Sequence, residues 1–282
     1  MHRHVPRTLA LLACVALAHD AAANVFVADR RVQRAADRPP YAAVGVLTHP
    51  KVGAGGTAFL VSSCHIATAF HVAFLRGRDA AGTVVLGSPK LGYAAEFLAG
   101  PDAKTPGRFA ARTRARVVAY GRFDAKDFAG MAGDWAILRL DDCLGERFGY
   151  LRHARATAST GAMPDGPLMT IGYPASRAGM AGITIETGCR ARDHGPVDGL
   201  VGIDCAFESG MSGGPVLQLQ PGGAWIVVGM IQQSMAPVFG VLPEYTMEHR
   251  NQMITVSTFR RAIDTALRAD ARRLLARRAA QR

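Results

Sequence analysis

The stretch Gly-Met-Ser-Gly-Gly-Pro-Val at residues 210–216 places the strongest constraint on how this chain folds. Glycines on both sides of Ser212, with a proline just after them, require a sharp backbone turn. Such a turn leaves one hydroxyl exposed and directs two amide N–H groups the same way, which suits a nucleophile in acyl transfer. Because a free serine hydroxyl is a weak nucleophile, the chain must also supply a base and a group that orients the base.

Two upstream stretches contain candidates for these partners. Thr-Ala-Phe-His at 68–71 ends an apolar, β-rich run, and Gly-Asp-Trp-Ala-Ile-Leu at 133–138 begins another. We expect His71 to be the general base and then the general acid, since an imidazole carries protons both ways near neutral pH. Asp134 is expected to orient His71. The order His71, Asp134, Ser212 differs from the order in subtilisin and in the α/β-hydrolases.

Four motifs in this order resemble those of trypsin-like (chymotrypsin-fold) serine endopeptidases. The resemblance is to the bacterial secreted kind, related to glutamyl endopeptidases and to the protease domain of HtrA-type enzymes. The motifs occupy residues 56–61 with 68–71, 134–138, 172–174 and 210–215. The resemblance implies an all-β fold of two antiparallel six-stranded barrels with the active site between them, and a protein or peptide substrate. It also implies an oxyanion hole formed by the backbone N–H groups of Gly210 and Ser212.

Other ionisable residues near these motifs fit the pattern less well. His65 precedes His71 by six residues and is expected to be an ordinary strand residue, because the family motif ends in Ala-x-His. Only Asp134 begins an Asp-x-Ala-x-Leu run. The neighbouring acids are therefore expected to be solvated loop or strand-end charges: Asp124, Asp127, Asp141 and Asp142.

Met211 departs from the digestive members of the family, which have an aspartate there. In those enzymes the aspartate pairs with the new N-terminus after zymogen cleavage, and methionine cannot form this ion pair. We therefore expect that removal of residues 24–40, if it occurs, is not needed to form the substrate pocket.

Counting back from Ser212 places the base of the specificity pocket near Ala206 and Phe207, and Ile231 and Gln232 are expected to line it. No acid lies at the expected floor, and Glu208 is expected at the rim. The strand at 227–233 lacks the histidine that glutamyl endopeptidases use. We expect cleavage after a small or medium apolar residue.

The chain divides into five segments. Residues 1–23 resemble a signal peptide, with Arg3 and Arg7 before a short apolar run and Ala-Ala-Ala at 21–23. Residues 24–40 are expected to be an N-terminal extension or propeptide, 41–155 the first barrel, 156–256 the second barrel, and 257–282 a helix with a basic tail. We expect export to the periplasm or the medium, without a permanent membrane anchor.

Short apolar runs separated by Gly, Pro and Asp clusters predict the strands of both barrels. The first set is 43–47, 57–61, 66–70, 83–86, 115–120 and 135–140, and the second is 167–173, 182–187, 201–207, 215–219, 225–231 and 251–256. Residues 99–111 are expected to be a surface loop. In the final helix, Ile263, Leu267, Ala271 and Leu274 recur on one face.

Four cysteines remain after residue 23, which in an exported chain suggests two disulfides with three alternative pairings. We favour Cys189 with Cys205, which would close a turn-rich stretch. Pairing Cys64 with Cys143 would then join the strands that carry base and orienter. Four buried free thiols are the alternative. The spacing does not favour zinc, and the sequence has no cofactor motif.

The formal charge of +11 is compatible with a basic exported protein. No nucleic-acid-binding module is recognisable. The arginine-rich C-terminus is expected to be a frayed tail, and its alternative role is a weak contact with a polyanion or a membrane surface.

Two other functions compete with a peptidase. Gly210-x-Ser212-x-Gly214 also fits the nucleophile elbow of α/β-hydrolase esterases, for which His249 is the only later histidine. That fold needs a parallel sheet with alternating helices, which the short strands do not predict. The second competitor is a protease-like binding module without turnover.

Overall fold

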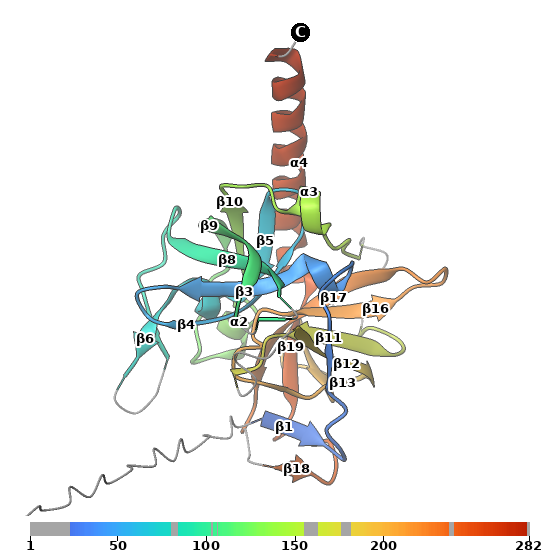
Figure 1. Cartoon of the computed structure of the whole chain (residues 1–282). Coiled ribbons are helices and arrows are strands. Elements are labelled where there is room, and N and C mark those ends of the chain that lie inside the picture. Colours follow the sequence, from blue (N-terminus) through green and yellow to red (C-terminus); the bar gives the residue numbers. More distant parts are fainter. Residues whose placement is uncertain are drawn as a thin grey trace, which may run out of the picture.

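The computed structural model describes residues 23–79, 84–102, 104–105, 107–154, 163–175, 182–236 and 240–280. Almost all of the predicted signal peptide and the predicted barrel boundary at 155/156 lie outside these residues. Strands dominate the described part, and a long C-terminal helix follows them (Figure 1).

Six strands close into a barrel in the N-terminal half, in the order β10-β5-β4-β3-β8-β9. Their bounds are β3 (Val44–His49), β4 (Ala54–Leu60), β5 (His65–Thr68), β8 (Ala94–Pro101), β9 (Phe109–Tyr120) and β10 (Ala136–Leu140). Every neighbouring pair is antiparallel. The first of the two predicted barrels is therefore present.

Two sequence expectations within this barrel are wrong. Residues 99–111 are not one surface loop, because β8 continues to Pro101 and β9 begins at Phe109. The predicted strand at 83–86 does not join the barrel, since β7 (Val84–Leu86) pairs only with β6 (Leu75–Arg78) as a separate hairpin. β8 occupies the place in the barrel that was predicted for residues 83–86, and it buries Phe97 in the core.

The C-terminal half forms an eight-stranded sheet in the order β13-β14-β19-β17-β16-β11-β12-β2. Its strands are β2 (Val32–Arg34), β11 (Leu168–Gly172), β12 (Ile183–Cys189), β13 (Ala191–His194), β14 (Leu200–Ile203), β16 (Pro215–Leu219), β17 (Trp225–Ser234) and β19 (Asn251–Thr255). Its hydrogen-bond order is open, so a second closed barrel is not found among the described strands. β12 and β13 lie near opposite ends of this order, yet only Arg190 separates them in the chain. The sheet must therefore curl so that its two ends come close together.

All neighbouring strands of both large sheets run antiparallel. The α/β-hydrolase fold, and with it the esterase alternative, requires a parallel sheet. That alternative does not fit this structure.

Residues 24–40, which the sequence assigns to an extension or propeptide, contribute strands to the C-terminal half. β1 (Ala23–Phe26) lies between β15 (Phe207–Glu208), which is antiparallel to it, and β18 (Val241–Leu242), which is parallel. β2 pairs with β12. These partners lie more than a hundred residues away in the sequence, so local patterns do not reveal the pairing.

Within the described residues, helices are few and mostly short. They are the 3-10 turn η1 (Tyr41–Ala43), α1 (Phe70–Ala73), α2 (Phe128–Met131), α3 (Gly145–Phe148) and α4 (Val256–Ala280). The first turns of α4 bury Phe259 and Ile263 in the main core cluster, which contains residues of both halves. None of the described helices is long and apolar enough to cross a membrane.

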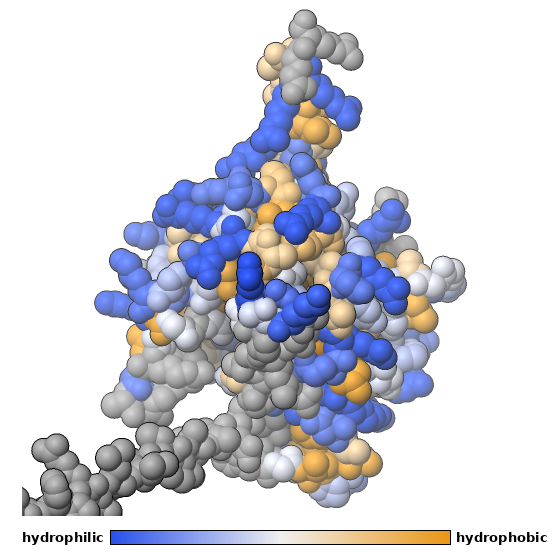
Figure 2. All heavy atoms as spheres, viewed as in Figure 1, coloured by the Kyte–Doolittle hydropathy of each residue, from blue (hydrophilic) through white to orange (hydrophobic). Residues whose placement is uncertain are grey.

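The end of α4 projects away from the body, where hydrophilic and hydrophobic side chains alternate along it (Figures 1 and 2). Leu274, predicted to face the core, is 50% exposed, and Leu275 is 65% exposed. The periodic pattern continues past the point where the helix leaves the body of the molecule, and no described surface covers its apolar residues there. Periodicity predicted the helix but not where its burial ends.

Substitution of Asn24 tests whether the N-terminal strand stabilises the fold. Its fully buried side chain donates to the backbone oxygens of Met235 (2.6 Å) and His249, and its own carbonyl accepts from Asn251 Nδ2 at 2.7 Å. Asn24→Ala leaves two partly buried carbonyls without this donor, so we expect a loss of about 2 kcal/mol in the free energy of unfolding. Denaturant unfolding measures it. The exposed Arg34→Ala is the control, and equal stability of both variants would contradict the prediction.

Candidate active site

His71 lies on α1, directly after strand β5. Ala69 has extended backbone before the helix, and this change of direction carries His71 off the barrel wall. Its neighbour Phe70 packs inward, with ring centroids 4.5 Å from Phe74 and 5.4 Å from Phe123. Burial of Phe70 thus fixes the helix, while the His71 side chain stays 22% exposed.

Asp134 meets the His71 ring from the segment between α2 and β10. Its Oδ2 lies 2.8 Å from His71 Nδ1, and its Oδ1 accepts the backbone N–H of His71 at 3.0 Å. The Asp134 side chain is only 1% exposed. Because the carboxylate accepts at Nδ1, it favours the tautomer with the proton there and directs Nε2 away from Asp134.

Ser212 lies on the turn between β15 and β16, against strand β4. The backbone N–H of Thr57 donates to Ser212 O at 2.9 Å. A Cβ added to Gly56 would come within 3.0 Å of Ser212 O and 2.7 Å of the Val72 side chain. The Ser212 backbone and helix α1 therefore adjoin the same short segment of β4, and the half-buried Ser212 lies beside the helix that carries His71.

The turn at 210–214 leaves two amide donors without a backbone acceptor. Met211, Gly213 and Gly214 each donate to a backbone carbonyl. Within the described part of the chain, neither Gly210 nor Ser212 does so. A side chain at Gly210, whose φ is +93°, would place its Cβ 2.5 Å from Tyr173 O. Glycine is therefore required at 210 both by conformation and by the close approach of Tyr173.

The Thr57 hydroxyl joins the two halves at this point. It donates to Gly210 O at 2.8 Å and accepts the backbone N–H of Tyr173 at 3.0 Å. Thr57 lies in one of the sequence motifs, but the sequence alone indicates no role for it. Its role depends on contacts more than a hundred residues away, which a single sequence does not show.

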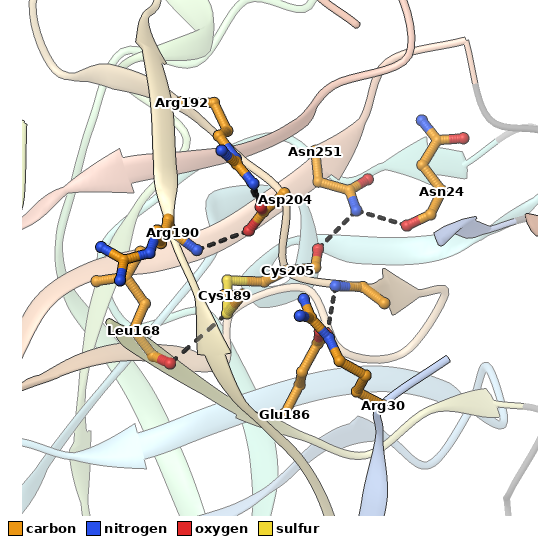
Figure 3. The surroundings of a disulfide bond; sticks show 11 residues. Asn24, Arg30, Leu168, Glu186, Cys189, Arg190, Arg192, Asp204, Cys205 and Asn251 are labelled. Atoms are coloured by element: carbon orange, nitrogen blue, oxygen red, sulfur yellow. Dashed lines mark hydrogen bonds and ion pairs between the residues drawn. A yellow bond between two sulfur atoms is a disulfide. The ribbon is translucent and has the colours of Figure 1, made fainter. Parts of the chain in front are cut away.

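Both disulfides have the favoured pairing, Cys64 with Cys143 and Cys189 with Cys205. The first joins the segment before β5 to the segment after β10, the strands next to His71 and Asp134. The second joins the end of β12 to the residue before Ala206, the first of the predicted pocket residues (Figure 3). Both therefore brace the surroundings of the candidate site.

Buried polar groups around Cys205 hold the chain that leads to Ser212 (Figure 3). The Asp204 carboxylate accepts from the backbone N–H of Arg190 and from Arg192 Nε, each at 2.6 Å. Asn251 Nδ2 donates to Cys205 O at 2.7 Å. Glu186 Oε2 accepts the backbone N–H of Ala206 at 2.5 Å.

Glu186 is buried, and this burial raises the pKa of its carboxyl, although Arg30 lies 3.0 Å away. Cys189, Asp204 and Cys205 are the one group of potential metal ligands found among the described residues. The two sulfur atoms are bonded to each other and are not thiolate ligands. This cluster is therefore structural.

The predicted pocket residues Ala206, Phe207, Ile231 and Gln232 are all buried in the C-terminal half. The Glu208 carboxylate, predicted at the rim, is 2.9 Å from Arg31 Nη1, and both side chains are almost fully buried. The rival histidine, His65, lies on β5 with Nδ1 near Ser62 Oγ (3.1 Å) and Asp270 Oδ2 (3.2 Å). Asp270 comes from α4, so His65 helps hold the C-terminal helix.

Comparison with known proteins agrees with this arrangement. Residues 56–230 match the trypsin-like peptidase domain family. The chain belongs to this family. The match extends from β4, which holds the Ser212 turn, through His71, Asp134 and Ser212 to β17.

Solved structures with the same fold include peptidases. A glutamyl endopeptidase is 18% identical with a TM-score of 0.57, and the alignment covers 86% of this chain and 99% of that one. A thermostable serine protease, AL20, from an extremophilic microorganism is also 18% identical, with a TM-score of 0.51 and coverage of 82% and 98%. At this identity they show a shared fold. A search of curated proteins gives no match.

Thr57 offers a test of how the Ser212 turn is held. Thr57→Val keeps the shape but removes the hydroxyl from Gly210 O and Tyr173 N, so we expect a loss of about 1–3 kcal/mol in unfolding free energy. Thr57→Ser keeps the hydroxyl and is the matched control. Denaturant unfolding distinguishes the two, and a Val variant as stable as the Ser variant would show that the hydroxyl does not hold the turn.

Proposed function

We propose that this trypsin-like peptidase is an exported serine endopeptidase that cleaves peptide bonds through Ser212, His71 and Asp134. The observation that carries the proposal is the buried Asp134 carboxylate 2.8 Å from His71 Nδ1, beside the turn with Ser212. A carboxylate in that position holds the imidazole in the tautomer that can accept a proton at Nε2.

In the proposed reaction, Ser212 Oγ attacks the peptide carbonyl carbon while His71 Nε2 takes the hydroxyl proton. The oxyanion that forms accepts hydrogen bonds from the N–H groups of Gly210 and Ser212. Collapse breaks the C–N bond, and His71 returns the proton to the leaving amine. Water then attacks the acyl-enzyme with His71 as base, which releases the acid and regenerates Ser212. Each oxyanion donor typically supplies about 3 kcal/mol of transition-state stabilisation.

The edge of β17 offers a place for an extended substrate. Pro215, the first residue of β16, pairs with Met230, while β17 continues to Ser234. At Gln233 and Ser234, one edge of β17 pairs with β19. Beyond Ile231, no described strand pairs with the opposite edge of β17. An extended peptide can add there by backbone hydrogen bonding, next to the Ser212 turn.

For specificity we propose a small or medium apolar residue at the cleavage site. The pocket candidates Ala206, Phe207 and Ile231 are apolar. Arg31 neutralises the nearby Glu208 carboxylate, so this acid is not free to select lysine or arginine. Export is supported by the two disulfides, which persist in oxidising compartments.

A fluorophosphonate probe, which labels activated serines, tests the proposal on the mature protein. We expect labelling of the wild type and none of Ser212→Ala or His71→Ala. Asp134→Asn should lower peptide turnover by about 10⁴, the size known for that change in a Ser-His-Asp triad, because the wrong imidazole tautomer is held.

Ser257→Ala, at the start of α4, is the matched control and should label like the wild type. Labelling of Ser212→Ala at the wild-type rate would exclude Ser212 as the nucleophile. A folded, disulfide-bonded wild type that neither labels nor cleaves a peptide library would instead favour the binding-module alternative.

A further inference from the structure

A pocket of about 640 Å³ lies on the first barrel, and its lining does not include His71, Asp134 or Ser212. It is formed where the turn after β3, the start of β6, the start of β8 and strand β9 meet. Its apolar and aromatic lining comes from Val52, Leu75, Tyr93 and Ala95. Lys51, Arg76 and Arg114 also line it and are exposed. We call it the basic pocket.

The basic pocket has an excess of positive charge. Within the described residues, none of Lys51, Arg76 and Arg114 forms an ion pair with a carboxylate. Glu96 is the acid of the lining, and it already pairs with Arg112 at 3.3 Å. A ligand with carboxylates would supply the missing countercharges, and salt would weaken its binding.

The lining of the basic pocket also favours a ligand with an apolar part. Val52 and Tyr93 are half-buried and offer apolar area to a ligand, and the Tyr93 ring lies beside those of Phe74 and His49. A free inorganic anion would leave this apolar area uncovered, whereas a peptide with acidic and aromatic side chains covers both parts. The volume falls in the range of ligand pockets, about 300–1,000 Å³.

The floor of the basic pocket is connected to the helix that carries His71. His49 Nε2 lies 2.9 Å from Val72 O, and Val72 follows His71 on α1. Burial lowers the pKa of His49, so its ring is neutral and donates to this carbonyl. Leu75 follows two residues after α1 ends. A segment bound here is thus held close to the catalytic helix.

We propose that the basic pocket binds an acidic, partly aromatic segment of the protein substrate, remote from the bond that is cleaved. The inference rests on the proposed peptidase function. It adds a second selection to the one proposed for residues near Ala206: a preferred substrate would carry an acidic segment at a fixed spacing from its cleavage site.

Binding can be measured without cleavage by using the full chain with Ser212→Ala. The probe is a short fluorescent peptide of Glu, Asp and Phe residues, followed by anisotropy. We expect the double variant Arg76→Glu/Arg114→Glu, in that background, to raise Kd at least about tenfold, because two attractive contacts become repulsive. Added salt should weaken binding by the parent protein. Arg272→Glu/Arg278→Glu on the projecting end of α4 makes the same change in charge and is the matched control.

Equal affinity of the pocket double variant and the Arg272→Glu/Arg278→Glu control would overturn the proposal. So would tighter binding of a single-stranded oligonucleotide that is lost in the same double variant, since the site would then select polyanions rather than acidic peptides. A Lys-for-Glu version of the probe should not bind.

Cleavage assays separate this proposal from the peptidase proposal. With Ser212 restored, the double variant should cleave a short neutral peptide at the wild-type rate. It should show a lower kcat/KM only for a substrate that also carries the acidic segment. If the wild type cleaves neither substrate while the acidic probe still binds, the peptidase proposal fails and the pocket stands as a binding site. If both substrates are cleaved equally by both proteins, the pocket proposal fails alone.

Discussion

The contact between strand β4 and the turn at 210–214 is the constraint on which the candidate site depends. Ser212 belongs to the C-terminal half, whereas His71 and Asp134 belong to the first barrel. Thr57 joins these parts with its N–H on Ser212 O and its hydroxyl on Gly210 O. Neither half contains the whole site, so its geometry is set by how closely these two backbones approach. The absence of a side chain at Gly56 and at Gly213 permits that approach.

Most of the candidate site could be predicted from the sequence because its residues lie in short motifs with strong local requirements. Gly210 needs positive φ, and the Asp134 segment is followed at once by a buried strand. The contact between His71 and Asp134 was predicted by resemblance and is present in the structure. What could not be predicted is the support around it, since Thr57 and Asn251 act through partners far away in the sequence.

The fold was predictable where hydrophobic alternation is local. Most strands of the first barrel follow the apolar runs, but β8 was missed because it ends in Ala-Gly-Pro at 99–101, which resembles the start of a loop. β1 and β2 were missed for another reason: they are short, lie in a charged segment and pair with strands encoded much later. In both cases the tertiary pairing overrides a weak local pattern.

Met211 shows how this turn keeps its shape without an inserted N-terminal charge. Its side chain is fully buried in an apolar cluster with Leu168 and Val216, and a Cβ on Gly172 would come within 3.0 Å of it. Apolar packing thus takes the place of an ion pair beneath Ser212. The N-terminal segment still reaches this region, but it does so as strand β1 on β15, held by neutral amide hydrogen bonds of Asn24 and Asn251. These are contacts between neutral groups, and they join the N-terminal strand to β15, which ends two residues before Gly210.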